Sequence, residues 1–120
     1  MSDDTIKLTT AQAIVGWLSS QFIKIDGKEE RLCGGGFGIF GHGNVTCLGE
    51  ALYNHKEELP LYRGQNEQSM GFAAAGYSKY WLRKRFMFCT ASAGPGTANL
   101  LTAAGPVSYT HLTLPTMYTV

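Results

Sequence analysis

The sequence predicts an α/β fold, with a partial doubly wound parallel sheet that carries helices on both faces. Three short runs rich in aromatic and branched residues, at 37–40, 61–63 and 86–90, have the length and composition of buried strands. Each run is followed by a turn of glycine or small polar residues, and then by apolar residues at helical spacing. Strands that alternate with helices favour parallel pairing with right-handed crossovers, so we expect one such sheet.

A helix is expected before the first strand. Thr9 or Thr10 can cap its start, and it should end near residues 22–23. The charged segment 26–30 is expected to be a turn within a solvated loop, and the glycines at 34–36 a flexible approach to the first strand. The face that this helix should bury is made by Ala13, Ile14, Trp17 and Leu18.

A helix is also expected after each of the three strands. The first should point Leu48, Ala51 and Leu52 inward. The second should run from residue 66 to about residue 79, and residues 96–104 should begin the third. Parallel sheets are buried on both faces, so these helices should be shared between the two sides.

The length, net charge, apolar runs and cysteine spacing of the chain exclude several classes of protein. A chain of 120 residues is one domain's worth of sequence, and its net charge of +1 gives no electrostatic reason to expect nucleic acid as a partner. No apolar run is long enough to cross a membrane, and the first residues are acidic and polar rather than a signal peptide. Cys33, Cys47 and Cys89 show no C-x-x-C spacing, so we expect buried free thiols in a cytoplasmic protein.

The last fifteen residues differ in composition from the rest. Residues 106–120 contain no Asp, Glu, Lys or Arg, whereas residues 1–105 contain all of them. The stretch 106–116 reads as a translated sequencing adapter of the kind used in library preparation. We therefore expect residues 1–105 to be the N-terminal part of a domain, and 106–120 to be a non-native adapter tail. The alternative is a genuine polar tail with β propensity.

Three turns are expected to form a ligand site. Open parallel sheets bind ligands beyond the carboxyl ends of their strands, where the turns 41–44, 64–67 and 91–96 should meet. Their glycines and small residues would let a ligand approach the backbone. Glu67 is the single carboxylate in these turns, and its alternative role is a helix-start residue stabilised by the helix dipole. The nucleotide-binding G-x-G-x-x-G motif is absent, which argues against a Rossmann dehydrogenase.

Two of these turns carry a family resemblance. Asn66-Glu67-Gln68, followed by an alanine-rich helix, is similar to the glutamate turn of the acetolactate-synthase-like thiamine diphosphate enzymes. Residues 90–100 look like the Gly-Pro-Gly-x-x-Asn-Leu loop and helix of the same superfamily. The resemblance covers about residues 6–104 and identifies a pyrimidine-binding N-terminal domain.

Three further segments resemble one subfamily, the bacterial trihydroxycyclohexane-1,2-dione hydrolases (acylhydrolases) of myo-inositol catabolism. They are residues 8–13, 26–30 and 39–45. Most members of the superfamily have Pro-Gly where this chain has His42-Gly43. The resemblance implies a thiamine diphosphate-dependent hydrolase that opens the ring of a polyol-derived dione by C–C cleavage. A carboligase or decarboxylase of 2-oxo acids is the nearest alternative, and a stand-alone, non-catalytic α/β binding module is the alternative of another class.

The resemblance also implies roles for individual residues. Glu67 would be catalytic, because the family's glutamate bonds the aminopyrimidine ring of the cofactor and favours the tautomer that generates the thiazolium ylid. His42 and Gln68 would lie on the substrate side, although His42 is equally explained as a turn histidine bonded to the backbone. Asn99 is expected only to tie its loop to its helix. The residues expected to bind the cofactor are Glu67, Gly94, Pro95, Gly96 and Asn44.

The resemblance further implies that part of the active site lies elsewhere. The family holds the diphosphate and Mg²⁺ in a C-terminal domain with a Gly-Asp-Gly motif, and no such motif occurs here. We therefore expect no metal ligand in this chain, and no turnover by the chain alone. The family's glutamate reaches cofactor held by a partner subunit, which implies a homodimer or a higher oligomer.

Overall fold

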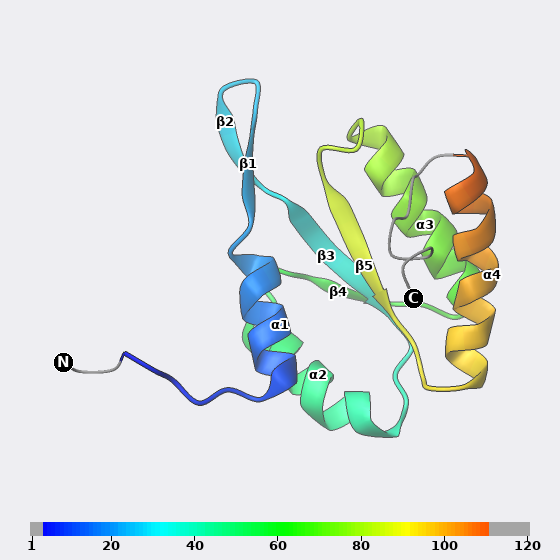
Figure 1. Ribbon diagram of the computed structural model, residues 1–120, viewed down its shortest axis with the longest axis horizontal. Helices are drawn as coiled ribbons and strands as arrows, with labels where there is room; N and C mark the ends of the chain where they lie inside the picture. Colours follow the sequence, from blue (N-terminus) through cyan, green and yellow to red (C-terminus); the bar gives the residue numbers. More distant parts are fainter. Residues whose placement is uncertain (1–3, 111–120) are drawn as a thin grey trace.

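The computed structural model describes residues 4–110, with the backbone alone from 106 to 110. Residues 111–120, which hold most of the expected adapter tail, lie outside the described residues. Figure 1 shows the elements in chain order. They are α1 (Thr10–Ser19), β1 (Phe22–Ile25), β2 (Lys28–Arg31), β3 (Cys33–Gly38), α2 (His42–Asn54), β4 (Leu61–Arg63), α3 (Glu67–Tyr80), β5 (Phe86–Thr90) and α4 (Pro95–Thr110).

The main sheet has three parallel strands in the order β4-β3-β5. Gly36 pairs with Leu61 on one side and with Phe88 on the other, so β3 is the central strand. Helices α1 and α2 cover one face, and α3 and α4 the other (Figure 1). The predicted α/β fold with a parallel sheet between helices is confirmed.

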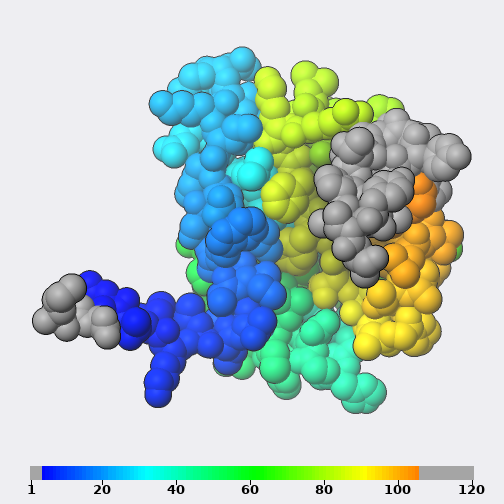
Figure 2. Space-filling view, viewed as in Figure 1, coloured from blue at the N-terminus to red at the C-terminus, as the bar shows by residue number. Residues whose placement is uncertain are grey.

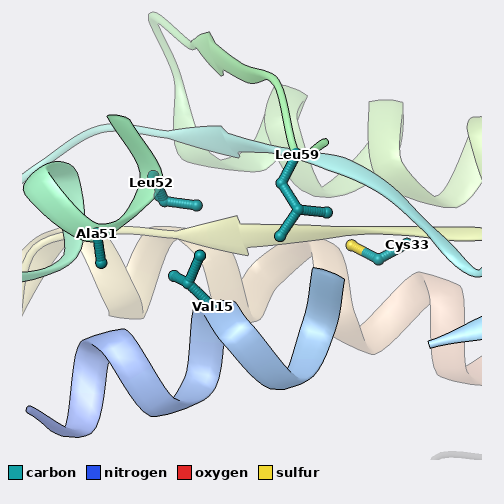
Figure 3. Close-up of a cluster of buried hydrophobic side chains, with 5 residues drawn as sticks. All are labelled: Val15, Cys33, Ala51, Leu52 and Leu59. Atoms are coloured by element: carbon teal, nitrogen blue, oxygen red, sulfur yellow. The ribbon is translucent and has the colours of Figure 1, made fainter. Parts of the chain in front are cut away.

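The apolar core lies between the sheet and the first two helices. Val15 comes from α1, Ala51 and Leu52 from α2, and Cys33 and Leu59 from the sheet side, and all five side chains converge (Figure 3). Burying each of the larger side chains stabilises the fold by about 1.5–3 kcal/mol. The prediction that Leu48, Ala51 and Leu52 face inward is confirmed, with Leu48 packed at the edge of the cluster.

The first helix buries only part of the face that was predicted: Leu18 is half-buried and packs against the core cluster, whereas the other three predicted residues are exposed. Thr9 caps it through a complete capping box with Gln12, as expected. Val15 and Ser19 are buried, whereas Ile14 is 49% exposed and Trp17 is 63% exposed. Ala13 is exposed as well. The helix carries apolar residues on most of its surface, so spacing alone did not distinguish the side that α2 covers.

The segment after this helix is a β-hairpin. The expected turn is confirmed at Asp26-Gly27, whereas the expectations of a longer helix and of a solvated loop are wrong. Strands β1 and β2 pair antiparallel, with Phe22 opposite Arg31. Asp26 and Gly27 make the two-residue turn, with φ values of 51° and 82°. An Asp-Gly pair suits the left-handed conformation that such a turn requires. The hairpin projects beyond the main sheet (Figures 1 and 2).

The first strand of the main sheet lies earlier than predicted. Strand β3 runs through the glycines at 34–36, which were expected to be flexible, and ends before Ile39 and Phe40. The Phe88 ring of β5 lies against Gly36, and a Cβ there would collide with it. Close packing across the sheet therefore explains a glycine inside this strand.

The remaining elements agree closely with the predictions. Strands β4 and β5 have the predicted bounds, and α3 begins and ends one residue later than expected. Helix α2 begins at His42, inside the segment expected to be a turn. Helix α4 begins at Pro95, one residue before the expected start, and continues to Thr110, into the segment assigned to the tail. All three cysteines are free, but only Cys33 is buried, so the expectation is wrong for the exposed Cys47 and for the partly exposed Cys89.

Candidate functional site

The three predicted turns meet at the carboxyl ends of the parallel strands. The amide of Gly64 donates to the carbonyl of Gly38 at 3.1 Å, and the amide of Ile39 donates to the carbonyl of Thr90 at 3.1 Å. These bonds continue the sheet pairing past the last residues of β3. The turns after β4 and β5 are thereby fixed on either side of the turn after β3.

Glu67 is the first residue of α3. Its helix is capped by Asn66, whose side-chain oxygen accepts from the Ser69 amide at 3.2 Å. Asn99 Nδ2, from α4, donates to Glu67 Oε2 at 2.8 Å. The hydrogen bond from Asn99 is the main cause that lowers the pKa of Glu67, and the backbone amide of Glu67 adds to it. Burial acts in the opposite direction and is outweighed, so the ionised carboxylate is favoured.

Gln68 and Asn99 extend this contact into a chain. Gln68 Nε2 donates to Asn99 Oδ1 at 2.8 Å. The Asn99 amide therefore contacts both of the first two side chains of α3. The side chain of Gln68 was expected on the substrate side, but the structure places it against α4. Asn99 was expected only to tie its loop to its helix, but its side chain contacts α3 as well. The sequence signal for Asn99 is its place one helical turn after Gly96.

The loop before α4 presses against Glu67. Gly96 is buried, and a Cβ built on it would lie 3.2 Å from Glu67 Oε1 and would collide with Ser92 Oγ. Gly94 has a φ of 82°, which glycine adopts without strain. Pro95 is the first residue of α4, a position that suits its fixed φ. The Gly-Pro-Gly loop therefore brings backbone to within contact of the carboxylate.

Asn44 and His42 occupy the first turn of α2. Asn44 Nδ2 reaches Thr90 Oγ1 at 3.4 Å and the Ala91 carbonyl at 3.5 Å, so it ties α2 to the end of β5. His42 is exposed. Among the hydrogen bonds of residues 4–105, none involves the His42 ring. The alternative of a histidine held by the backbone therefore has no bond to support it in this part of the chain.

Two hollows open at the same end of the sheet. One of about 380 Å³ lies between the ends of β3 and β4 and the start of α2. A second, of about 550 Å³, adjoins it and includes Gly64 and Gln65, which lead into Glu67. Ile39 and Arg63 line both hollows. A small polar ligand therefore has room beside the carboxylate turn.

The described residues contain no cluster of three or more His, Cys, Asp or Glu side chains that could hold a metal ion. Within the same part of the chain, no helix is long and apolar enough to span a membrane.

The family model described as thiamine pyrophosphate enzyme, N-terminal TPP binding domain, matches residues 36–114. This range includes all three turns, Glu67 and the Gly-Pro-Gly loop. No solved structure matches the chain significantly.

Curated relatives share about half of their residues with this chain. A protein of Listeria innocua named 3D-(3,5/4)-trihydroxycyclohexane-1,2-dione hydrolase is 50% identical over 105 residues, which are 88% of this chain and 16% of the relative. Proteins of the same name from Bacillus thuringiensis and Bacillus cereus are each 46% identical over 108 residues, 90% of this chain and 17% of each relative. The chain thus spans about one sixth of the length of the curated relatives it matches.

Proposed function

This chain belongs to the thiamine pyrophosphate enzymes through their N-terminal TPP-binding domain, and on that premise we propose a function for it. It forms the pyrimidine side of the cofactor site of a larger hydrolase. The observation that carries the proposal is the Glu67 carboxylate. It lies at the carboxyl end of the sheet, with Asn99 on one oxygen and Gly96 beside the other.

The residues around Glu67 fit an aromatic ring nitrogen. Asn99 occupies Oε2, so Oε1 is the oxygen left to meet a ligand. A side chain larger than glycine at position 96 would crowd that oxygen. Thiamine diphosphate, when bound, supplies the carbon nucleophile of the reaction. In the proposal, the Glu67 carboxylate forms a hydrogen bond with the aminopyrimidine nitrogen and shares a proton with it, in the role of a positioned acid or base.

The proposed substrate is a trihydroxycyclohexane-1,2-dione, because that compound is in the printed name of the relatives. The proposed reaction opens its ring by C–C bond cleavage, within myo-inositol degradation. We propose that exposed His42, at the mouth of the site, contacts the hydroxyl or carbonyl groups of this substrate. Gly94, Pro95 and Gly96 would border the pyrimidine ring, and Asn44 would hold α2 in place beside it.

The site is proposed to be completed by other parts of the protein. In this proposal Mg²⁺ and the diphosphate are held by a C-terminal domain, and Glu67 meets cofactor bound by a partner subunit in a homodimer or larger assembly. The chain of 120 residues alone would then be inactive. The free cysteines are consistent with the proposed cytoplasmic location.

Assays of the complete gene product test this function. Ring opening of the dione that depends on thiamine diphosphate and Mg²⁺, without turnover of pyruvate, is the expected result. Pyruvate turnover without ring opening would instead assign a carboligase or decarboxylase. A purified chain of residues 1–120 that melts cooperatively as a monomer and binds a ligand unaided would favour the stand-alone module.

We also propose that residues 106–120 are translated adapter sequence. Re-amplifying the source DNA across codon 105 without that adapter tests it. A reading frame that continues with different codons after 105 is the expected result. Finding codons 106–120 in the source DNA would contradict it.

A further inference from the structure

The most specific polar arrangement in the described chain joins two helices far apart in sequence. The Asn99 amide lies between Glu67 and Gln68, with its nitrogen 2.8 Å from Glu67 Oε2 and its oxygen 2.8 Å from Gln68 Nε2. All three side chains are half-buried. One residue of α4 thus contacts both side chains that open α3.

We propose that Asn99 is a positioning residue that holds Glu67 as an oriented carboxylate, and that Gln68 fixes the direction of the Asn99 amide. The catalytic consequence rests on the proposed function of Glu67. The geometry itself is a property of this chain.

The direction of the bonds follows from the chemistry of the groups. An ionised carboxylate only accepts hydrogen bonds, so it selects the nitrogen end of the Asn99 amide. The oxygen end then faces α3 and selects the nitrogen of Gln68. Without Gln68, the amide could turn over and present its oxygen to the carboxylate, which is unfavourable for the charged form.

The two carboxylate oxygens of Glu67 therefore have different neighbours. Asn99 engages Oε2, and Gly96 lies against Oε1. The hydrogen bond from Asn99 is the first cause that lowers the pKa of Glu67, followed by its own amide, and no charged side chain of residues 4–105 contributes to the shift. Removing Asn99 should therefore let the pKa rise toward its ordinary value. If Asn99 only joined its loop to its helix, the titration of Glu67 would not change.

Carbon NMR of the 120-residue chain, labelled at the side-chain carboxyl carbon of glutamate, tests the proposal. The Glu67 signal is assigned as the one lost in Glu67→Gln. Its pKa should rise in Asn99→Ala, and rise by less in Gln68→Ala, where the amide remains but can turn. Thr102→Ala and Ser69→Ala are matched controls on the same two helices and should leave the titration unchanged. All four variants introduce alanine, the residue most compatible with a helix.

An unchanged Glu67 titration in Asn99→Ala, or an equal shift in Thr102→Ala, would overturn the role of Asn99. A shift in Asn99→Ala with none in Gln68→Ala would remove Gln68 from the proposal. Amide spectra report whether each variant is folded. In the complete enzyme, the acid limb of the kcat/KM profile should move to higher pH in Asn99→Ala, which provides a second reading if that variant of the short chain is unfolded.

The two proposals fail separately. The titration uses neither cofactor nor substrate, so an enzyme inactive on the dione would contradict only the proposed reaction. A Glu67 titration that is unchanged in Asn99→Ala would contradict the positioning role of Asn99 and leave the proposed role of Glu67 intact.

Discussion

The two faces of the sheet are packed by different means. On the α1 and α2 side, Leu52, Leu59 and Val15 fill the space with bulky apolar side chains that are almost fully buried. On the α3 and α4 side the helices approach closely through small residues, and a Cβ on Gly71 would lie 2.6 Å from the Cβ of Ala103. One face therefore contributes mainly apolar volume, while the other sets the separation of two helices, on which the contacts of Asn99 depend.

The largest expected effect comes from the site. In the complete enzyme, Glu67→Gln should lower kcat by about 10²–10⁴-fold, the usual contribution of a positioned acid or base. The amide keeps the shape of the side chain, so the thermal midpoint should stay near that of the unmodified enzyme. Steady-state kinetics together with a melting curve measure both quantities. Full retained activity would remove Glu67 from the catalytic role.

A change in the bulky face should affect stability and leave the site intact. Leu52→Ala removes a buried side chain from the cluster around Val15 and should lower the free energy of unfolding by about 2–5 kcal/mol. Denaturant unfolding monitored by circular dichroism measures the loss. If the faces are independent, the titration of Glu67 in the folded variant remains that of the unmodified chain. A shifted titration would show that the two faces are coupled.

A change in the close-packed face should affect both stability and site. Gly71→Ala forces α3 away from Ala103 and should cost about 1–3 kcal/mol, as overpacked positions do. The shift of α3 would also stretch the bond between Asn99 and Glu67, so the pKa of Glu67 should rise. Gly76→Ala, on the same helix with open space around it, is the control: it should leave the Glu67 titration unchanged and should raise stability by about 0.5–1 kcal/mol, because alanine favours a helix more than glycine does. A normal Glu67 titration in a destabilised Gly71→Ala chain would contradict this account.

The smallest effect is expected in the hairpin, which belongs to neither face. Gly27 has a φ of 82°, and an alanine there should cost about 1–2 kcal/mol because its Cβ meets the backbone in the left-handed region. The same denaturant titration measures this cost. Gly16→Ala, which meets open space inside α1, is the control and should raise stability by about 0.5–1 kcal/mol, because alanine favours a helix more than glycine does. A Gly27→Ala chain as stable as the parent would show that the turn does not hold this geometry in solution.

The lowered pKa of Glu67 also fixes the sign of one pH effect. Its carboxylate favours the folded chain at pH values above the pKa it has when unfolded, and this contribution is lost as the pH falls through the folded pKa.

The sequence predicted the elements whose signals are local. Strands Leu61–Arg63 and Phe86–Thr90 have the predicted bounds because each is a short apolar run with clear turn residues after it. The hairpin was missed, although Asp26-Gly27 is a strong turn signal, because the charged residues around it favoured a loop. The position of β3 was misjudged because its glycines are explained only by the Phe88 ring, which lies far along the chain.

In the candidate site, too, only the features with a local sequence signal could be predicted. Glu67 and the Gly-Pro-Gly loop could be found from residue type and position, because each stands at a strand-to-helix turn. The contacts of Asn99 with Glu67 and Gln68 could not, since they depend on how closely α3 and α4 approach. The lower pKa of Glu67 could not be predicted either. Burial raises this pKa and hydrogen bonds lower it, and only the geometry of the folded site decides which effect is larger.

The strand order β4-β3-β5 also bears on how the chain is assembled during synthesis. The central strand leaves the ribosome first, and each later strand can add to an edge that already exists. Within residues 4–110, none of the three strands has to insert between two others that are already paired. For these three strands, the order of synthesis therefore matches the order in which they can pair, and Asn99, the partner of Glu67, follows them in α4.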